Sequence, residues 1–298
     1  MSAPRERMDE ASAPPRPASV MTPRGRVEYA EHGAGPAVLA LHGAMGGWDQ
    51  SLLLARTIAG SGYRFIGLSR PGYLGTPLDA GRSPEEQADL YAAVLDALGV
   101  RRAAVLAVSG GGPSAMSFAL RHRERCRGLV LVSTCGGKVE TRLPLAFQLL
   151  KLAARWPWLA AAMERKAAGR DPAEAARRSI PDPALRERTL ADPGAGPLFR
   201  ELLASTSDRM ALRLPGTLQD VAVTRAWACP LERIAVPVLV VHGTEDRGVP
   251  FAQHGKVLAE RIPGAELVAL RGGEHVAIFT HREEARARVV RFLAASAG

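Results

Sequence analysis

The sequence predicts an α/β fold: a doubly wound, mostly parallel sheet with an inserted helical segment. Three observations lead to this class. Short apolar runs that end in glycine, such as "AVLALHG", alternate with helical patterns, which is the rhythm of βαβ units. That rhythm stops near Gly136 and resumes near Ile234. The chain has 298 residues, of which 47% are hydrophobic, so it is long enough to bury a full core.

The expected strands and helices follow one another in order. "GRVEYAEHG" alternates as an edge strand does, whereas "AVLALHG" and "YRFIGLSRPG" are apolar runs typical of strands buried on both faces. A helix is expected after Ser83, with Ser83 as N-cap, Pro84 at its first position, Glu86 completing a capping box and Gly99 ending it. Further elements are "RAAVLAVSG", a helix over 113–122, "RGLVLVSTCGG", "IAVPVLVVHGTEDRGVP", a helix over 251–261, "AELVALRGGEH" and a terminal helix "REEARARVVRFLAAS".

The chain divides into a tail, a core and an insertion. Residues 1–22 are rich in Pro, Ala, Arg and Ser without an apolar stretch, so we expect a disordered tail and no secretory signal. Residues 23–136 and 227–298 carry the strand patterns and form the α/β core. Residues 137–226 contain helical patterns interrupted by proline, which predicts a helical cap inserted between the fourth and fifth βα repeats.

Composition excludes several classes of partner. The formal charge of +9 comes mostly from arginines that are scattered along the chain and form no basic block, so no nucleic-acid partner is expected. No stretch is long and apolar enough for stable membrane insertion. The three cysteines are an odd number, are not closely paired in the sequence and fit no metal-ligand motif. This favours a reducing, cytoplasmic location and no metal site. The sequence does not indicate an oligomeric state.

One serine stands out at the end of an apolar run. In "LAVSGGGPSA" three glycines follow Ser109 just before a helical pattern. A glycine-rich helix start can bind phosphate, but this run lacks both the Walker lysine and a GxGxxG pattern. The alternative is a sharp strand-to-helix turn that exposes Ser109 as a nucleophile. We favour the nucleophile.

An aspartate and a histidine complete a chemical set with this serine. In an α/β sheet, ligands bind beyond the carboxyl ends of the strands, and the residues at those ends include Ser109, Asp246 and His275, in that order along the chain. The histidine follows the last strand and a Gly-Gly loop. Glu245, beside Asp246, is a second candidate for the acid.

Residues 27–293 resemble the α/β-hydrolase fold family. The resemblance rests on "LHGAMGGW", "SRPGYLGTP", "AVSGGGPSAMSFALRH", "VLVVHGTEDRGVP" and "GGEHVAIF", in the family's order on the expected strand ends. This sequence departs from the family's G-x-S-x-G pattern at its first position, where Ala107 replaces the glycine. The resemblance implies a doubly wound sheet, a helical cap, no cofactor and hydrolysis of an ester or related acyl bond.

The same resemblance assigns roles to residues. It implies that Ser109 is the nucleophile, that His275 is the general base and acid, and that Asp246 orients the histidine. The oxyanion hole is then formed by the backbone amides of Ala44 and Gly110. Glu274 either raises the pKa of the histidine or faces solvent, and Arg70 has no expected role beyond a structural ion pair.

The cap suggests the kind of substrate. Its apolar first half carries Phe147 and Trp156, and Trp48 follows the presumed oxyanion loop. If these side chains line the pocket, the substrate is hydrophobic; a purely structural role for the cap helices is equally open.

The expected function is therefore that of a serine esterase: cleavage of an ester, lactone or thioester of a small to medium hydrophobic acid, with a small-molecule acyl compound as the partner. The alternatives on the same three residues are a cofactor-free haloperoxidase or perhydrolase and a carbon–carbon bond hydrolase. A non-catalytic small-molecule receptor is the alternative from another class.

Overall fold

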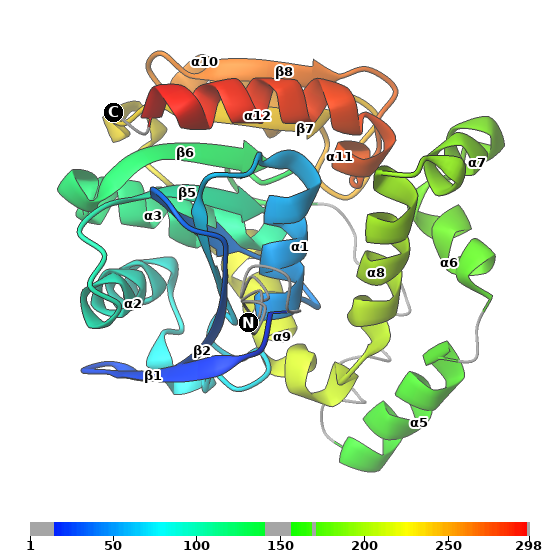
Figure 1. The fold of residues 1–298 in the computed structure, drawn as a ribbon, viewed down its shortest axis with the longest axis horizontal. Helices are drawn as coiled ribbons and strands as arrows, with labels where there is room; N and C mark the ends of the chain where they lie inside the picture. Colours follow the sequence, from blue (N-terminus) through cyan, green and yellow to red (C-terminus); the bar gives the residue numbers. More distant parts are fainter. Residues whose placement is uncertain (1–14, 141–155, 169–170, 297–298) are drawn as a thin grey trace, which may run out of the picture.

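An eight-stranded sheet forms the centre of the molecule (Figure 1). The computed structural model describes residues 15–140, 156–168 and 171–296. The strand order is β1-β2-β4-β3-β5-β6-β7-β8; β1 and β2 are antiparallel to their neighbours and the other strands are parallel. The strands are β1 (Ala18–Thr22), β2 (Gly25–His32), β3 (Ala37–Leu41), β4 (Arg64–Leu68), β5 (Ala103–Val108), β6 (Cys126–Val132), β7 (Val238–Gly243) and β8 (Glu266–Leu270).

Helices cover both faces of this sheet, as a doubly wound fold requires. On one face, α2 (Pro84–Ala97), α3 (Gly112–Arg121) and α10 (Gly255–Arg261) bury their apolar side chains against the strands. On the other face, α1 (Trp48–Ile58), α11 (Ala277–Thr280) and α12 (Arg282–Ser296) do the same. The central strands β3, β5 and β7 are buried along their whole length or nearly so, which explains their uninterrupted apolar sequences.

The capping box at the start of α2 is present as predicted. Ser83 Oγ accepts a hydrogen bond from the backbone N–H of Glu86 at 3.2 Å, and the Glu86 carboxylate accepts from the Ser83 N–H at 3.0 Å. The helix predicted over 251–261 starts later, at Gly255, because the preceding residues form turns in which the His254 N–H bonds to the Pro250 carbonyl.

The prediction of a disordered tail over residues 1–22 is wrong for its last part. Ala18–Thr22 form β1, which pairs antiparallel with β2 through a tight hairpin. Gly25 closes this hairpin with φ 121°, a backbone angle that glycine adopts without strain. An exposed edge strand needs few apolar residues, so the composition of this segment did not indicate that β1 would form. Residues 1–14 lie outside the described residues.

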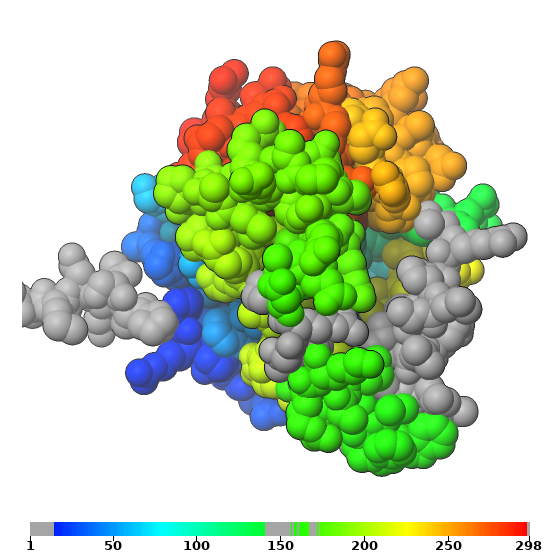
Figure 2. Space-filling view, turned by 90° about the vertical axis from the view of Figure 1, so that its right-hand side faces the viewer, coloured from blue at the N-terminus to red at the C-terminus, as the bar shows by residue number. Residues whose placement is uncertain are grey.

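The segment between β6 and β7 contributes five described α-helices, which are joined by turns and loops. It contains α5 (Pro157–Ala168), α6 (Pro172–Ser179), α7 (Pro183–Ala191), α8 (Ala195–Ser207) and α9 (Met210–Ala226). The arrowheads of β6 and β8 point toward the side of the molecule where α6, α7 and α8 lie (Figure 1), and Figure 2 shows these helices spread over that side. Among the described helices, none has the length and apolar character needed to cross a membrane.

The sheet has its topological switch point between β3 and β5. From β3 the chain moves to β4 on one side, and it then returns to form β5 on the other side of β3. The loops that leave β3 and β5 therefore diverge and open a crevice at the carboxyl ends of the strands, where α/β folds bind their ligands.

Candidate active site

Ser109 occupies a sharp turn at this crevice. It directly follows β5, and its φ of 51° lies in the left-handed region that only glycine adopts freely. A short 3₁₀ turn over Ser109–Gly111 then leads into α3. A non-glycine residue held in this conformation costs about 1–3 kcal/mol and marks a position that the surrounding structure constrains.

The three glycines after Ser109 are explained by close approaches. A Cβ atom on Gly110 would lie 2.7 Å from Asp220 Oδ2, one on Gly111 would lie 2.8 Å from the His42 carbonyl oxygen, and one on Gly112 would lie 1.9 Å from Thr134 Oγ1. Each glycine thus meets a different neighbour at a distance that no side chain allows. Packing of the turn, and not phosphate binding, accounts for the sequence "SGGG".

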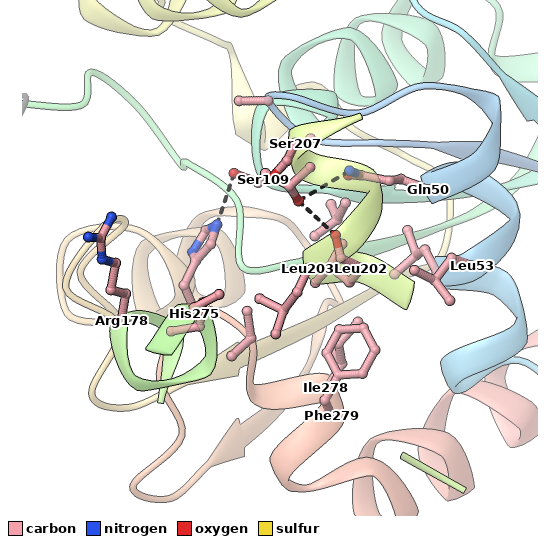
Figure 3. A pocket seen from close by; sticks show the side chains of 18 of the residues that line it. Gln50, Leu53, Ser109, Arg178, Leu202, Leu203, Ser207, His275, Ile278 and Phe279 are labelled. Carbon is pink, nitrogen blue, oxygen red and sulfur yellow. Dashed lines mark hydrogen bonds between the residues drawn. The ribbon is translucent and has the colours of Figure 1, made fainter. Parts of the chain in front are cut away.

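Ser109, His275 and Asp246 form a continuous chain of hydrogen-bonding contacts. His275 Nε2 lies 3.1 Å from Ser109 Oγ, and His275 Nδ1 lies 2.7 Å from Asp246 Oδ2. Figure 3 shows the His275 ring facing Ser109. The three residues come from the loops after β5, β7 and β8, so the fold brings together positions that are up to 166 residues apart in the sequence.

The Asp246 carboxylate is held on both of its oxygens. Oδ1 accepts hydrogen bonds from the N–H groups of Gly248 and Val249, each at 2.9 Å. Oδ2 faces His275 and also lies 3.4 Å from His242 Nε2. Its neighbour Glu245, the second candidate acid, is exposed. Of these two candidate acids, Asp246 is the one whose described contacts include His275.

His275 and Asp246 each stabilise the charged form of the other. Burial lowers the pKa of His275, but the hydrogen bond and the charge of Asp246 and the charge of Glu274 together raise it above its ordinary value. Burial raises the pKa of Asp246, but hydrogen bonds from His242, His275 and Val249 outweigh this and hold it well below its ordinary range. Asp246 is therefore ionised at neutral pH, and His275 takes up a proton more readily than a free imidazole.

Glu274 does not project freely into solvent. Its side chain is only 14% exposed and forms an ion pair with Arg247 at 3.3 Å. Burial raises the pKa of Glu274, although the charge of Arg247 lowers it. Of the two interpretations that the sequence left open, the structure supports the one in which Glu274 raises the pKa of His275.

The loop after β3 packs directly against the serine. A Cβ on Gly43 would lie 3.0 Å from Ser109 Cβ and 3.6 Å from its Oγ, so the backbone of Gly43 and Ala44 passes beside the hydroxyl. The next residue, Met45, has φ 58°, which turns the chain back toward α1. The amides of Ala44 and Gly110, predicted as oxyanion donors, belong to the two segments that flank Ser109.

A cavity of about 440 Å³ opens at this site. Core residues Ala44, Val108, Ser109 and His275 form its floor, and α6 and α8 close it from above. Its walls are mainly apolar, and Figure 3 shows several of these side chains grouped near Ser109: Leu53, Leu202, Leu203, Ile278 and Phe279. Charged residues enter the lining from α6, where Glu174 and Arg178 form an ion pair at 3.7 Å.

Two of the three predicted pocket residues, Trp48 and Trp156, are described, and they do not belong to this lining. Trp48 is the first residue of α1 and packs with the apolar cluster beneath that helix. Trp156 is 45% exposed and precedes α5. Neither is among the described residues that line the cavity. Phe147 lies outside the described residues. The hydrophobic character of these side chains does not indicate whether they point into the cavity, because that depends on where each helix is placed.

Sequence reasoning missed the partner of Arg70. This arginine is 1% exposed and forms a buried ion pair with Asp220 on α9, 150 residues away. Tyr73 donates its hydroxyl to the same carboxylate at 2.6 Å. The motif "SRPGY" was visible in the sequence, but nothing local pointed to an acid in the inserted segment.

Comparison with known protein families identifies the family of this fold. A family model described as alpha/beta hydrolase fold matches residues 36–282. The chain is similar to an uncharacterized hydrolase of Bacillus subtilis, with 28% identity over 85% of this chain and 89% of that protein. It is equally similar to a 2-hydroxy-6-oxononadienedioate/2-hydroxy-6-oxononatrienedioate hydrolase of Burkholderia vietnamiensis, with 28% identity over 90% of this chain and 91% of that protein.

Among solved structures, the chain resembles an alpha/beta hydrolase fold protein from Nakamurella multipartita. The two are 35% identical, with a TM-score of 0.80 over 95% of this chain and 100% of the other. A hydrolase from Pseudomonas aeruginosa is 27% identical, with a TM-score of 0.64 over 93% of this chain and 98% of the other.

Proposed function

This chain belongs to the alpha/beta hydrolase fold family and is a hydrolase, and from that premise we propose that it cleaves an ester, lactone or thioester of a small to medium hydrophobic acid through an acyl-enzyme on Ser109. The observation that carries the proposal is the contact chain from Ser109 Oγ through His275 to the ionised Asp246. It lies at the floor of a mainly apolar cavity, as an acyl substrate requires.

The proposed reaction has two halves. His275 Nε2 takes the proton from the Ser109 hydroxyl as Oγ attacks the acyl carbonyl, and the carbonyl oxygen becomes an oxyanion between the amides of Ala44 and Gly110. The C–O or C–S bond then breaks, and His275 returns the proton to the leaving alcohol or thiol. Water, deprotonated by the same histidine, then attacks the acyl-enzyme; the bond between the acyl carbon and Ser109 Oγ breaks, His275 returns the proton to Oγ, and the acid is released. Asp246 accepts a hydrogen bond from the N–H at Nδ1 of His275, which leaves Nε2 of the neutral ring free to take the proton of Ser109.

A fluorophosphonate probe tests the nucleophile. We expect wild-type protein to gain one covalent adduct, located on Ser109 by mass spectrometry, and Ser109→Ala to gain none. Ser207→Ala is the matched control, because Ser207 lines the same cavity, whereas among the described residues the hydrogen-bonding partners of His275 are Ser109 and Asp246. It should label at the wild-type rate. Labelling of Ser109→Ala at the wild-type level, or no labelling of folded wild type, would contradict the proposal.

A second candidate, hydrolysis of a carbon–carbon bond, is favoured by two observations. The Burkholderia vietnamiensis relative is named for a dienedioate substrate, and Arg178 brings a guanidinium, a strong carboxylate ligand, into the lining of the cavity. Turnover of p-nitrophenyl butyrate compared with that of a 2-hydroxy-6-oxo-dienedioate decides between the two. Faster ester turnover supports the first proposal, and faster dienedioate turnover supports the second.

A further inference from the structure

The last helix of the inserted segment, α9, is attached to the core along one face. Arg213, Gly216, Thr217 and Asp220 are spaced three, one and three residues apart, which places them in a single stripe on a helix. All four are buried. Each contacts a different part of the core, and two of those parts carry the predicted oxyanion donors.

A proline inside α9 provides part of the attachment. Pro215 has no N–H and disturbs the helical turn before it. Beside it, the Gly216 N–H donates to the Gly72 carbonyl at 2.9 Å, and the Leu212 carbonyl accepts from the Leu74 N–H at 2.8 Å. Backbone groups of the helix thus bond to the loop after β4. This fixes the position of α9 along the core.

Thr217 holds the oxyanion loop. Its hydroxyl donates to the Arg213 carbonyl at 2.8 Å, so its oxygen remains free to accept the Met45 N–H, which it does at 2.9 Å. Met45 is the strained residue with φ 58° that directly follows Ala44. From the other side, Gln50 Nε2 donates to the Met45 carbonyl at 3.1 Å. Both polar groups of the Met45 backbone are therefore bonded.

Asp220 supports the second donor segment. Its carboxylate accepts from Arg70 and from the Tyr73 hydroxyl. These partners hold Oδ2 only 2.7 Å from where a Cβ of Gly110 would be. Asp220 is 7% exposed and Arg70 is 1% exposed, so solvent does not screen this pair. The carboxylate therefore lies against the turn that carries the Gly110 amide.

We propose that Thr217 and Asp220, three residues apart on α9, are positioning residues that set the two donors of the oxyanion hole. Thr217 acts through Met45 on the amide of Ala44, and Asp220 acts through its contact with Gly110. The inference rests on the proposed function, since it concerns donors that matter only when an oxyanion forms. It makes α9 a part of the reaction site's framework, although its residues are absent from the lining of the cavity in the described structure.

Loss of the Thr217 hydroxyl has a defined consequence. In Thr217→Val the side chain keeps its volume and branching, but the Met45 N–H loses its acceptor. We expect the Ala44–Met45 peptide to shift, and with it the Ala44 backbone, which moves the Ala44 N–H away from the oxyanion. Misplacement of a catalytic group by about 1 Å costs on the order of 100-fold in rate, so kcat falls by roughly 10- to 100-fold. KM changes little, because the apolar walls are untouched.

The experiment measures kcat and KM for p-nitrophenyl butyrate in four proteins: wild type, Thr217→Val, Thr217→Ser and Thr224→Val. Thr224 is the matched control because its hydroxyl, within the part of the chain that the structure describes, bonds to carbonyls of α9 itself, those of Asp220 and Val221. We expect Thr224→Val to stay within about twofold of wild type. Thr217→Ser keeps the acceptor oxygen and restores most of kcat. The rate of fluorophosphonate labelling should fall in parallel with kcat.

Each outcome decides the inference. A kcat for Thr217→Val within about twofold of wild type, or an equal loss in Thr224→Val, would overturn it. So would a loss that Thr217→Ser does not restore, because a hydroxyl acceptor would then not be the cause. If wild type labels on Ser109 and Thr217→Val behaves like wild type, this inference alone fails. If folded wild type neither labels nor turns over ester, the proposed function fails and the inference fails with it.

Discussion

At the scale of the residue, the histidine of the site is tuned by two acids of different kinds. Asp246 contacts His275 at 2.7 Å and is fixed by two backbone N–H groups. Glu274, the preceding residue in the chain, acts only through its charge and is turned toward Arg247. Asp246 orients the ring and raises its pKa through both its hydrogen bond and its charge, and Glu274 adds a smaller increase through its charge alone.

The pH dependence of Glu274→Gln tests this division. A general base must be neutral, so kcat/KM is lost as the pH falls through the pKa of His275, which in wild type lies above its ordinary value. Removing the Glu274 charge lowers that pKa and moves the acidic limb of the profile to lower pH. Glu245→Gln, which removes an exposed acid, should leave the limb in place. A limb that stays fixed, or moves to higher pH, in Glu274→Gln would contradict this assignment.

At the scale of the element, the turn from β5 into α3 is built by packing against three separate segments. The loop after β3, the residue Thr134 after β6, and Asp220 on α9 all touch the run of glycines. Thr134 also donates its hydroxyl to the Ser109 carbonyl at 2.5 Å. The turn that carries Ser109 is therefore held by contacts from the sheet and the inserted segment together.

Gly112→Ala tests whether this contact is steric. Gly112 has helical backbone angles that suit any residue, so the only obstacle to a Cβ is Thr134, at 1.9 Å. We expect a loss of about 1–3 kcal/mol in the free energy of unfolding, typical of overpacking, measured by urea denaturation. Gly137→Ala is the control, since no atom of the described residues lies within 4 Å of its Cβ position. Equal stability of the two variants would show that the turn can rearrange.

At the scale of the whole molecule, the cavity lies between two layers of different origin. The strand ends supply the reactive groups, and helices α6 and α8 supply much of the wall that an acyl chain would contact. Residues of α8, among them Leu202 and Leu203, face Ile278 and Phe279 of α11 in this space (Figure 3). Under the proposed function, we expect the inserted helices to set the length of acyl chain that the site accepts.

Leu203→Phe tests this arrangement. The larger side chain fills part of the cavity, so kcat/KM for p-nitrophenyl octanoate should fall about tenfold relative to that for the acetate. Leu212→Phe is the control, because Leu212 is 51% exposed and does not belong to the lining. The ratio of the two esters should not change there. An unchanged ratio in Leu203→Phe would exclude the α8 wall as a determinant of chain length.

The sequence by itself determined the fold class, the family and the three residues that meet at the site. Local patterns suffice for this. Apolar runs identify buried strands, polar residues after them identify the carboxyl edge of the sheet, and parallel strands bring those ends together. Ser109, Asp246 and His275 could be predicted because each follows such a run, and the model matched to residues 36–282 supports the family.

Only the tertiary structure decided which side chains surround those three. The ion pair of Arg70 with Asp220, the support of Met45 by Thr217, and the lining by α6 and α8 join segments more than 100 residues apart. The exposed positions of Trp156 and Trp158 likewise depend on where α5 lies. The sequence shows whether a side chain is apolar or polar, but it does not show which way that side chain points. Its direction is set by the packing of whole helices, which no local pattern encodes.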